Sequence, residues 1–129
     1  MKIALAQFNA VVGDLPGNEA RLLAAYRRAA DAGADLVLTP ELGLCGYPPR
    51  DLLHRSRFVE DCQAAVQRLA QATGRTGLIV GFPERQPDRP GRPFRNAAAL
   101  LHDGALAATR AKTLLPTYDV FDEDRYFEP

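Results

Sequence analysis

Residues 34–50, "ADLVLTPELGLCGYPPR", hold a short apolar run that stops at a proline. The run Asp35–Leu38 is typical of a buried β-strand. A single carboxylate, Glu41, follows at once. Glycines, a cysteine and a double proline come next and predict a tight turn. The stretch therefore indicates a strand that delivers one carboxylate to its carboxyl end.

Further strands and helices are predicted on both sides of this stretch. Apolar runs predict strands at Lys2–Phe8 and at Gly77–Phe82. Apolar residues at helical spacing predict one helix that follows Asn18 as its N-cap and another that follows Ser56 as its N-cap. Strand, helix, strand, helix, strand is the order of βαβ units, which build parallel sheets.

The pattern changes after the third strand. Residues 83–93, "PERQPDRPGRP", contain four prolines and several charges and predict an exposed loop. Residues 95–112, "RNAAALLHDGALAATRAK", predict a β-hairpin that turns at Asp103-Gly104. The predicted fold class is therefore α/β, with a mixed sheet built from βαβ units and then a β-hairpin.

Composition excludes several classes of protein. The 129 residues suffice for one domain, and their formal net charge of zero gives no electrostatic footprint for nucleic acid or an anionic membrane. We find no signal peptide and no apolar run long enough to span a membrane. Cys45 and Cys62 are too few for a disulfide framework, and with His54 and His102 they match no zinc-ligand spacing. These observations favour a cytoplasmic protein without a metal site.

Two charged residues are candidates for chemistry. Glu41 directly follows a strand, and ligands of open α/β sheets collect at the carboxyl ends of strands. Counting by two from Leu106 places Lys112 on a half-apolar strand face, where a buried lysine needs a partner such as Glu41. The alternatives are a solvated loop carboxylate and a lysine whose charged end reaches water.

The cysteines give weaker signals. Cys45 has no base in helical or strand register, and its small neighbours fit a tight turn equally well. Cys62 falls on the apolar stripe of the second predicted helix, as a small buried residue does. We therefore interpret Cys45 as a turn residue and Cys62 as a core residue.

Three segments together resemble a known family. They are "KIALAQFNAVVGDLPGN" (2–18), "PELGLCGYPPRDLL" (40–53) and "RAKTLLPTYDVFDEDRYFEP" (110–129). They are similar to the glutaminase domain of glutamine-dependent NAD⁺ synthetases, which belongs to the carbon–nitrogen hydrolase, or nitrilase, superfamily. The resemblance implies an α-β-β-α sandwich. Residues 1–129 would be an incomplete domain, the first half of that sandwich.

The resemblance also implies roles for individual residues. Glu41 takes the place of the catalytic general base, and Lys112 that of the lysine that stabilises the oxyanion. Tyr118 falls at a position that helps to bind the glutamine substrate, and Tyr47 is expected to line the same pocket.

This sequence departs from the family at the nucleophile. The family's cysteine lies on a later strand end, and neither Cys45 nor Cys62 occupies that place. The ATP-binding synthetase domain, with its SGGxDS loop, is absent too. The chain is therefore expected to be inactive alone and to bind no cofactor itself, while ATP and Mg²⁺ belong to the missing domain. The implied partners are glutamine, a C-terminal synthetase domain and, in the full-length enzyme, further copies in a homo-oligomer.

Two other functions stay open at this point. The chain could belong to a stand-alone nitrilase-type amidase that acts on another carboxamide. It could also be a non-catalytic folded or binding module that keeps the scaffold without the thiol.

Overall fold

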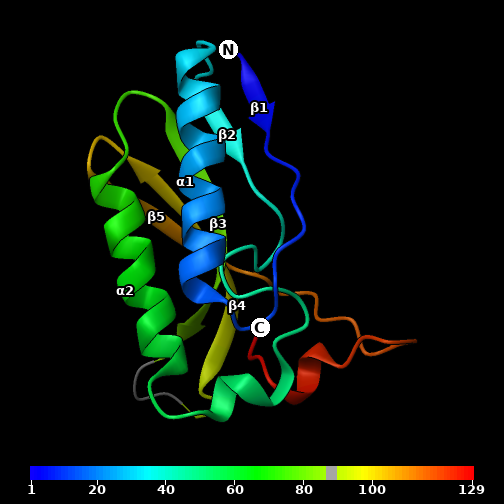
Figure 1. Cartoon of the computed structure of the whole chain (residues 1–129). Coiled ribbons are helices and arrows are strands. Elements are labelled where there is room, and N and C mark those ends of the chain that lie inside the picture. Colours follow the sequence, from blue (N-terminus) through cyan, green and yellow to red (C-terminus); the bar gives the residue numbers. More distant parts are fainter. Residues whose placement is uncertain (87–89) are drawn as a thin grey trace.

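The computed structural model describes residues 1–86 and 90–129, which form a sheet with helices packed on it (Figure 1). The elements follow the predicted order. In chain order they are β1 (Ile3–Leu5), α1 (Leu15–Asp31), β2 (Leu36–Leu38), the 3₁₀ helix η1 (Arg50–His54), α2 (Phe58–Gln71), β3 (Gly77–Arg85), β4 (Phe94–His102), β5 (Ala105–Ala111) and the 3₁₀ helix η2 (Glu123–Arg125).

The sheet is mixed, as predicted. Its strands lie in the order β1-β2-β3-β4-β5. The pairs β1–β2 and β2–β3 are parallel, whereas β3–β4 and β4–β5 are antiparallel. The hairpin turn is confirmed at Asp103-Gly104, where φ is 47° and 79°. Positive φ at both central residues is the conformation that a tight two-residue hairpin requires.

Both α-helices cover one face of the sheet, and the core lies between the two layers (Figure 1). The core contains Leu22 and Tyr26 of α1, Val59, Cys62, Val66 and Leu69 of α2, and Val37, Leu78, Val80, Phe82, Ala97, Ala99 and Leu101 of the sheet. Burial of this apolar surface is what holds the two layers together. In the described part of the chain, no helix covers the opposite face, where Leu5 is 71% exposed and Leu38 40%.

Two strands differ from the prediction by three residues at their carboxyl ends. β1 stops at Leu5 rather than Phe8, because β2 ends at Leu38, the residue that Leu5 pairs with. β3 runs on to Arg85, because residues 83–85 pair with β4. The predicted loop over 83–93 is therefore wrong for residues 83–85 and confirmed for residues 90–93. Residues 87–89 of the predicted loop lie outside the described part of the chain.

Both predicted helix caps are wrong. α1 begins before Asn18, and Asp14 is the cap, since its carboxylate accepts a hydrogen bond from the backbone N–H of Gly17. α2 begins at Phe58, after Arg57 in the left-handed region and without any side-chain cap.

The described residues contain no helix that combines the length and the apolar character needed to cross a membrane.

Candidate active site

Glu41 lies in a turn that follows β2 and rests directly on the sheet. Thr39 fixes the start of the turn, since both its N–H and its hydroxyl donate to the carbonyl of Ile79 on β3. A Cβ atom at Gly81 would lie 2.5 Å from the backbone nitrogen of Leu42, so only glycine lets the turn approach β3 this closely. The Glu41 side chain is 48% exposed. The carboxylate therefore projects from a rigidly placed backbone.

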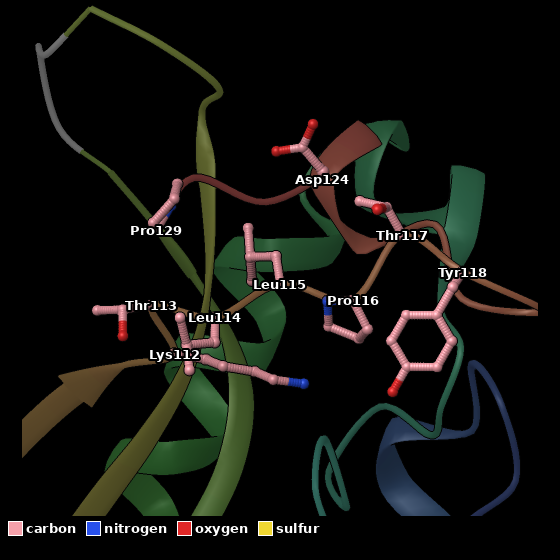
Figure 2. A pocket seen from close by; sticks show the side chains of 9 residues that line it. All are labelled: Lys112, Thr113, Leu114, Leu115, Pro116, Thr117, Tyr118, Asp124 and Pro129. Atoms are coloured by element: carbon pink, nitrogen blue, oxygen red, sulfur yellow. The ribbon is translucent and has the colours of Figure 1, made fainter.

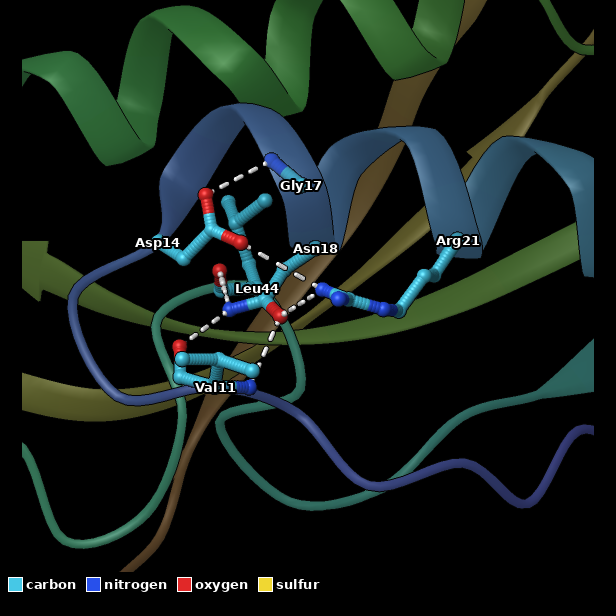
Figure 3. Close-up of polar contacts among 6 residues, drawn as sticks. All are labelled: Val11, Asp14, Gly17, Asn18, Arg21 and Leu44. Carbon is cyan, nitrogen blue, oxygen red and sulfur yellow. Dashed lines mark hydrogen bonds and ion pairs between the residues drawn. The ribbon is translucent and has the colours of Figure 1, made fainter.

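Asn18 holds this turn from the other side (Figure 3). Its fully buried amide donates to the carbonyls of Leu44, at 3.0 Å, and Val11, at 2.8 Å. Its carbonyl accepts from the N–H of Val11. Because Asn18 is part of α1, the helix, the loop before it and the Glu41 turn are tied together by one side chain.

Lys112 follows β5 and reaches the Glu41 carboxylate. Its ammonium lies 2.9 Å from Oε1 of Glu41, a contact between residues 71 positions apart in sequence. The predicted contact is thus confirmed, but the face count behind it is wrong. The pairing of β4 with β5 shifts register between Leu100 and Leu101, so Leu106 and Lys112 do not lie on one continuous strand face.

A second carboxylate, Glu123 of η2, completes a three-residue cluster. It is 4% exposed and accepts a hydrogen bond from the Lys112 ammonium at 3.1 Å. Its Oε2 lies 3.0 Å from the same ammonium, outside hydrogen-bonding geometry, so charge attraction alone acts there. Burial by itself would lower the pKa of Lys112, but the hydrogen bonds to Glu41 and Glu123 outweigh it and raise that pKa.

Tyr47 belongs to this cluster as well. Its hydroxyl donates to Oε1 of Glu123 at 2.8 Å. Burial and this hydrogen bond raise the pKa of Tyr47 above its usual value. Tyr47 therefore stays a neutral donor and helps to satisfy the buried carboxylate of Glu123.

Asn96 of β4 is the other neighbour of Glu41. Its side-chain amide lies 2.6 Å from Oε1 of Glu41, and its backbone carbonyl accepts from the N–H of Lys112. Asn96 itself is 4% exposed. Sequence reasoning missed both Asn96 and Glu123. A buried acid is expected to pair with a nearby cation, but nothing in the run of acids at 119–128 singles out Glu123.

Two open cavities meet at Lys112. One, of about 340 Å³, lies over the uncovered sheet face and is lined by Glu41, Asn96 and Lys112 among others. The other, of about 630 Å³, runs along residues 112–118 (Figure 2). Tyr118 lines this second cavity, is 69% exposed and stacks edge-on against Phe121. The structure thus brings Glu41, Lys112 and Tyr47 into one cluster and leaves Tyr118 at the rim.

Both thiols are buried. Cys45 is a turn residue, as predicted, and its thiol donates to the carbonyl of Gly46. Cys62 is a core residue of α2, and the neighbouring Cys45 thiol, together with burial, raises the pKa of Cys62. The described residues contain no group of three His, Cys, Asp or Glu side chains suited to a metal ion.

Comparison with known proteins identifies one family whose sequences match almost the whole of this chain. The profile of the carbon-nitrogen hydrolase family matches residues 2–129. A glutamine-dependent NAD(+) synthetase of Synechocystis sp. is 46% identical over 129 residues, a match that covers 97% of this chain and 23% of the relative. This chain therefore spans about a quarter of the length of the curated relatives it matches.

Solved structures agree with the sequence matches. A glutamine-dependent NAD+ synthetase from Acinetobacter baumannii superposes with a TM-score of 0.89 at 35% identity, covering 98% of this chain and 23% of that one. An amidase from Nesterenkonia sp. superposes with a TM-score of 0.78 at 30% identity, covering 100% of this chain and 48% of the amidase.

Proposed function

This chain belongs to the carbon-nitrogen hydrolase family, and from that we propose that it is part of a glutamine-dependent NAD(+) synthetase. In this proposal residues 1–129 supply Glu41 and Lys112 to the site that hydrolyses glutamine. The ammonia released there amidates nicotinate adenine dinucleotide in an ATP-dependent step elsewhere in the enzyme.

The observation that carries the proposal is the contact between Glu41 and Lys112. An exposed carboxylate and a half-buried ammonium, from distant parts of the chain, lie 2.9 Å apart at the mouth of a cavity. Glu123 holds the ammonium from its buried side, so the exposed carboxylate stays free to meet a substrate. Such a pair can serve the hydrolysis of a carboxamide, with the carboxylate as the base and the ammonium facing the developing oxyanion.

The chemistry follows from the two charges. Glu41 takes the proton of a thiol as the sulfur attacks the carboxamide carbon of glutamine. The ammonium of Lys112 stabilises the negative oxygen of the tetrahedral intermediate. Protonated Glu41 then returns its proton to the nitrogen, ammonia leaves, and water hydrolyses the thioester to glutamate and free thiol.

We assign the thiol to a cysteine outside residues 1–129, because Cys45 and Cys62 are both buried in the core. On this proposal residues 1–129 alone are inactive. ATP and Mg²⁺ belong to the synthetase part, and no residue of this chain is assigned to them. Tyr47 and Tyr118 are proposed to line the glutamine pocket. A cytoplasmic location and a homo-oligomeric enzyme complete the proposal.

The test uses a hybrid enzyme, the Synechocystis relative with its matching segment replaced by residues 1–129. We expect the hybrid to make NAD from glutamine and from free ammonia. Glu41→Gln should abolish the glutamine-dependent reaction and leave the ammonia-driven one intact. Glu60→Gln is the matched control, since Glu60 is 47% exposed and pairs with Arg85. A hybrid that uses ammonia but never glutamine would contradict the proposal, as would full activity of Glu41→Gln.

A second candidate function is an amidase that acts on other carboxamides. The Nesterenkonia amidase superposes on the whole of this chain, and this favours the second candidate function. The Glu41–Lys112 pair serves any carboxamide, so the two candidates differ in their substrate. Faster release of ammonia from short aliphatic amides than from glutamine would favour the amidase.

A further inference from the structure

We propose that Asn96 is the positioning residue that fixes the Glu41 carboxylate and the direction in which its free oxygen, the base, points. This inference rests on the proposed function, because it concerns the same reaction. It adds a residue that the sequence did not single out.

The first step concerns hydrogen bonding at Glu41. Oε1 accepts from the Asn96 amide at 2.6 Å and from the Lys112 ammonium at 2.9 Å. An ionised carboxylate can only accept, so the NH₂ end of Asn96 must face it. Within residues 1–86 and 90–129, no side chain or backbone group donates to Oε2. Oε1 is thus fully engaged, and Oε2 is the oxygen left to receive a proton from the thiol.

The second step concerns rigidity. Asn96 is 4% exposed and lies near the start of β4, paired with Pro83 of β3. Its backbone carbonyl accepts from the N–H of Lys112 at 2.8 Å. One residue therefore holds the base through its side chain and the lysine through its backbone. The distance between the two catalytic charges is set by Asn96 rather than by the flexible ends of Glu41 and Lys112.

The third step asks what would happen without the amide. Glu41 is half exposed, so its carboxylate would be held by Lys112 alone and could rotate about its own side-chain bonds. Rotation turns the free oxygen, which acts as the base, away from the thiol. Misplacement of a catalytic group by about 1 Å can cost on the order of 100-fold in rate. Substrate binding should change little, since Asn96 exposes only 4% of its surface and its side-chain amide is engaged by Glu41.

The experiment measures kcat and KM for glutamine in the hybrid enzyme. We expect Asn96→Ala to lower kcat by about 10- to 100-fold and to change KM less than about threefold. Leu100→Ala, a half-buried position on the same strand and face, is the control for lost packing and should keep kcat. Ammonia-driven synthesis should be unchanged in both variants.

A second variant separates positioning from simple loss of structure. Asn96→Asp keeps the shape but presents a carboxyl, which donates to Glu41 only when it is protonated. The charged groups that face this position are Glu41 and Lys112, with Glu123 behind the ammonium and Arg110 beside them on β5. We expect the activity of Asn96→Asp, relative to the unsubstituted hybrid, to rise as the pH falls.

The outcomes distinguish the two proposals. An unsubstituted hybrid that fails with glutamine but works with ammonia overturns the proposed function. A working hybrid in which Asn96→Ala keeps its kcat overturns the positioning role alone. A variant that loses glutamine- and ammonia-driven activity together, or an equal loss in Leu100→Ala, assigns Asn96 a structural role and also overturns it.

Discussion

At the scale of residues, the ammonium of Lys112 contacts two carboxylates that differ in their exposure to solvent. Glu123 is buried and Glu41 is half exposed, so they play different parts around Lys112. The buried carboxylate has no access to a substrate and serves to anchor the ammonium. We propose that the exposed one is the carboxylate that takes the proton of the thiol. Environment, rather than residue type, separates the two acids.

The raised pKa of Lys112 predicts how stability depends on pH. The pKa of Lys112 is higher in the folded protein than in the unfolded chain, where it is about 10.4. The stabilisation is therefore complete below about pH 10.4 and is lost as the pH rises through the folded-state pKa. The free energy of unfolding should therefore differ between the wild type and Lys112→Met by a constant amount near neutral pH. Above about pH 10.5 the difference should shrink.

Urea denaturation of both proteins over that range measures this effect. A difference that stays the same from about pH 8 to about pH 11 would mean that the two carboxylates do not stabilise the ammonium.

Glu41, Lys112 and Tyr47 of this cluster were predicted from the sequence. Glu41 could be found because it directly follows a strand. Lys112 was found by a face count that is wrong and by the resemblance to the family. Glu123 and Asn96 could not be found. Their importance depends on strand register and on the fold of residues 113–123, and neither leaves a local pattern in the sequence. Tyr47 was expected at the substrate pocket, and its hydroxyl binds Glu123.

At the scale of elements, the Glu41 turn is held by contacts that are distant in sequence. Asn18 was predicted to cap α1 because asparagine favours that position. Asp14 takes the cap, and Asn18 lies inside the helix, where its buried amide bonds to Val11 and Leu44. Local propensity could not reveal this, since the partners of Asn18 belong to two other loops. The order of strands and helices, which follows from local periodicity, was predicted correctly.

Removing this amide should loosen both loops. Asn18→Ala leaves the carbonyl of Leu44 and the N–H of Val11 without their partner, and leaves the carbonyl of Val11 with the N–H of Asp14 alone. We expect a loss of about 2–4 kcal/mol in the free energy of unfolding, measured by chemical denaturation. Gln67→Ala removes an exposed amide from α2 and should change stability by less than about 0.5 kcal/mol. Equal effects of the two substitutions would show that the Asn18 hydrogen bonds contribute nothing.

At the scale of the whole molecule, the sheet has one covered and one uncovered face. The pairing registers place Leu5, Leu38, Ile79, Leu100 and Ala108 in a row across all the strands on the uncovered face. A contiguous apolar row of this kind is normally covered in a folded protein. The α-β-β-α sandwich proposed for the family would place a second sheet there.

Residues 1–129 by themselves should associate through this row. Sedimentation velocity should show species that grow with protein concentration, and Leu38→Lys should shift them towards the monomer. Leu114→Lys is the control, because Leu114 is 85% exposed but lies outside the row. A wild-type chain that stays monomeric at every concentration would contradict this account of the uncovered face.

The central claim is that Glu41 and Lys112 act as one catalytic unit, and a double-mutant cycle tests it most directly. Glutamine hydrolysis by the hybrid enzyme would be measured for Glu41→Gln, Lys112→Met and the double variant. We predict that each single substitution lowers kcat/KM by about 100- to 10,000-fold and that the double variant is no worse than the poorer single one. A double variant whose loss equals the product of the two single losses would mean that the residues act independently, and would contradict the claim.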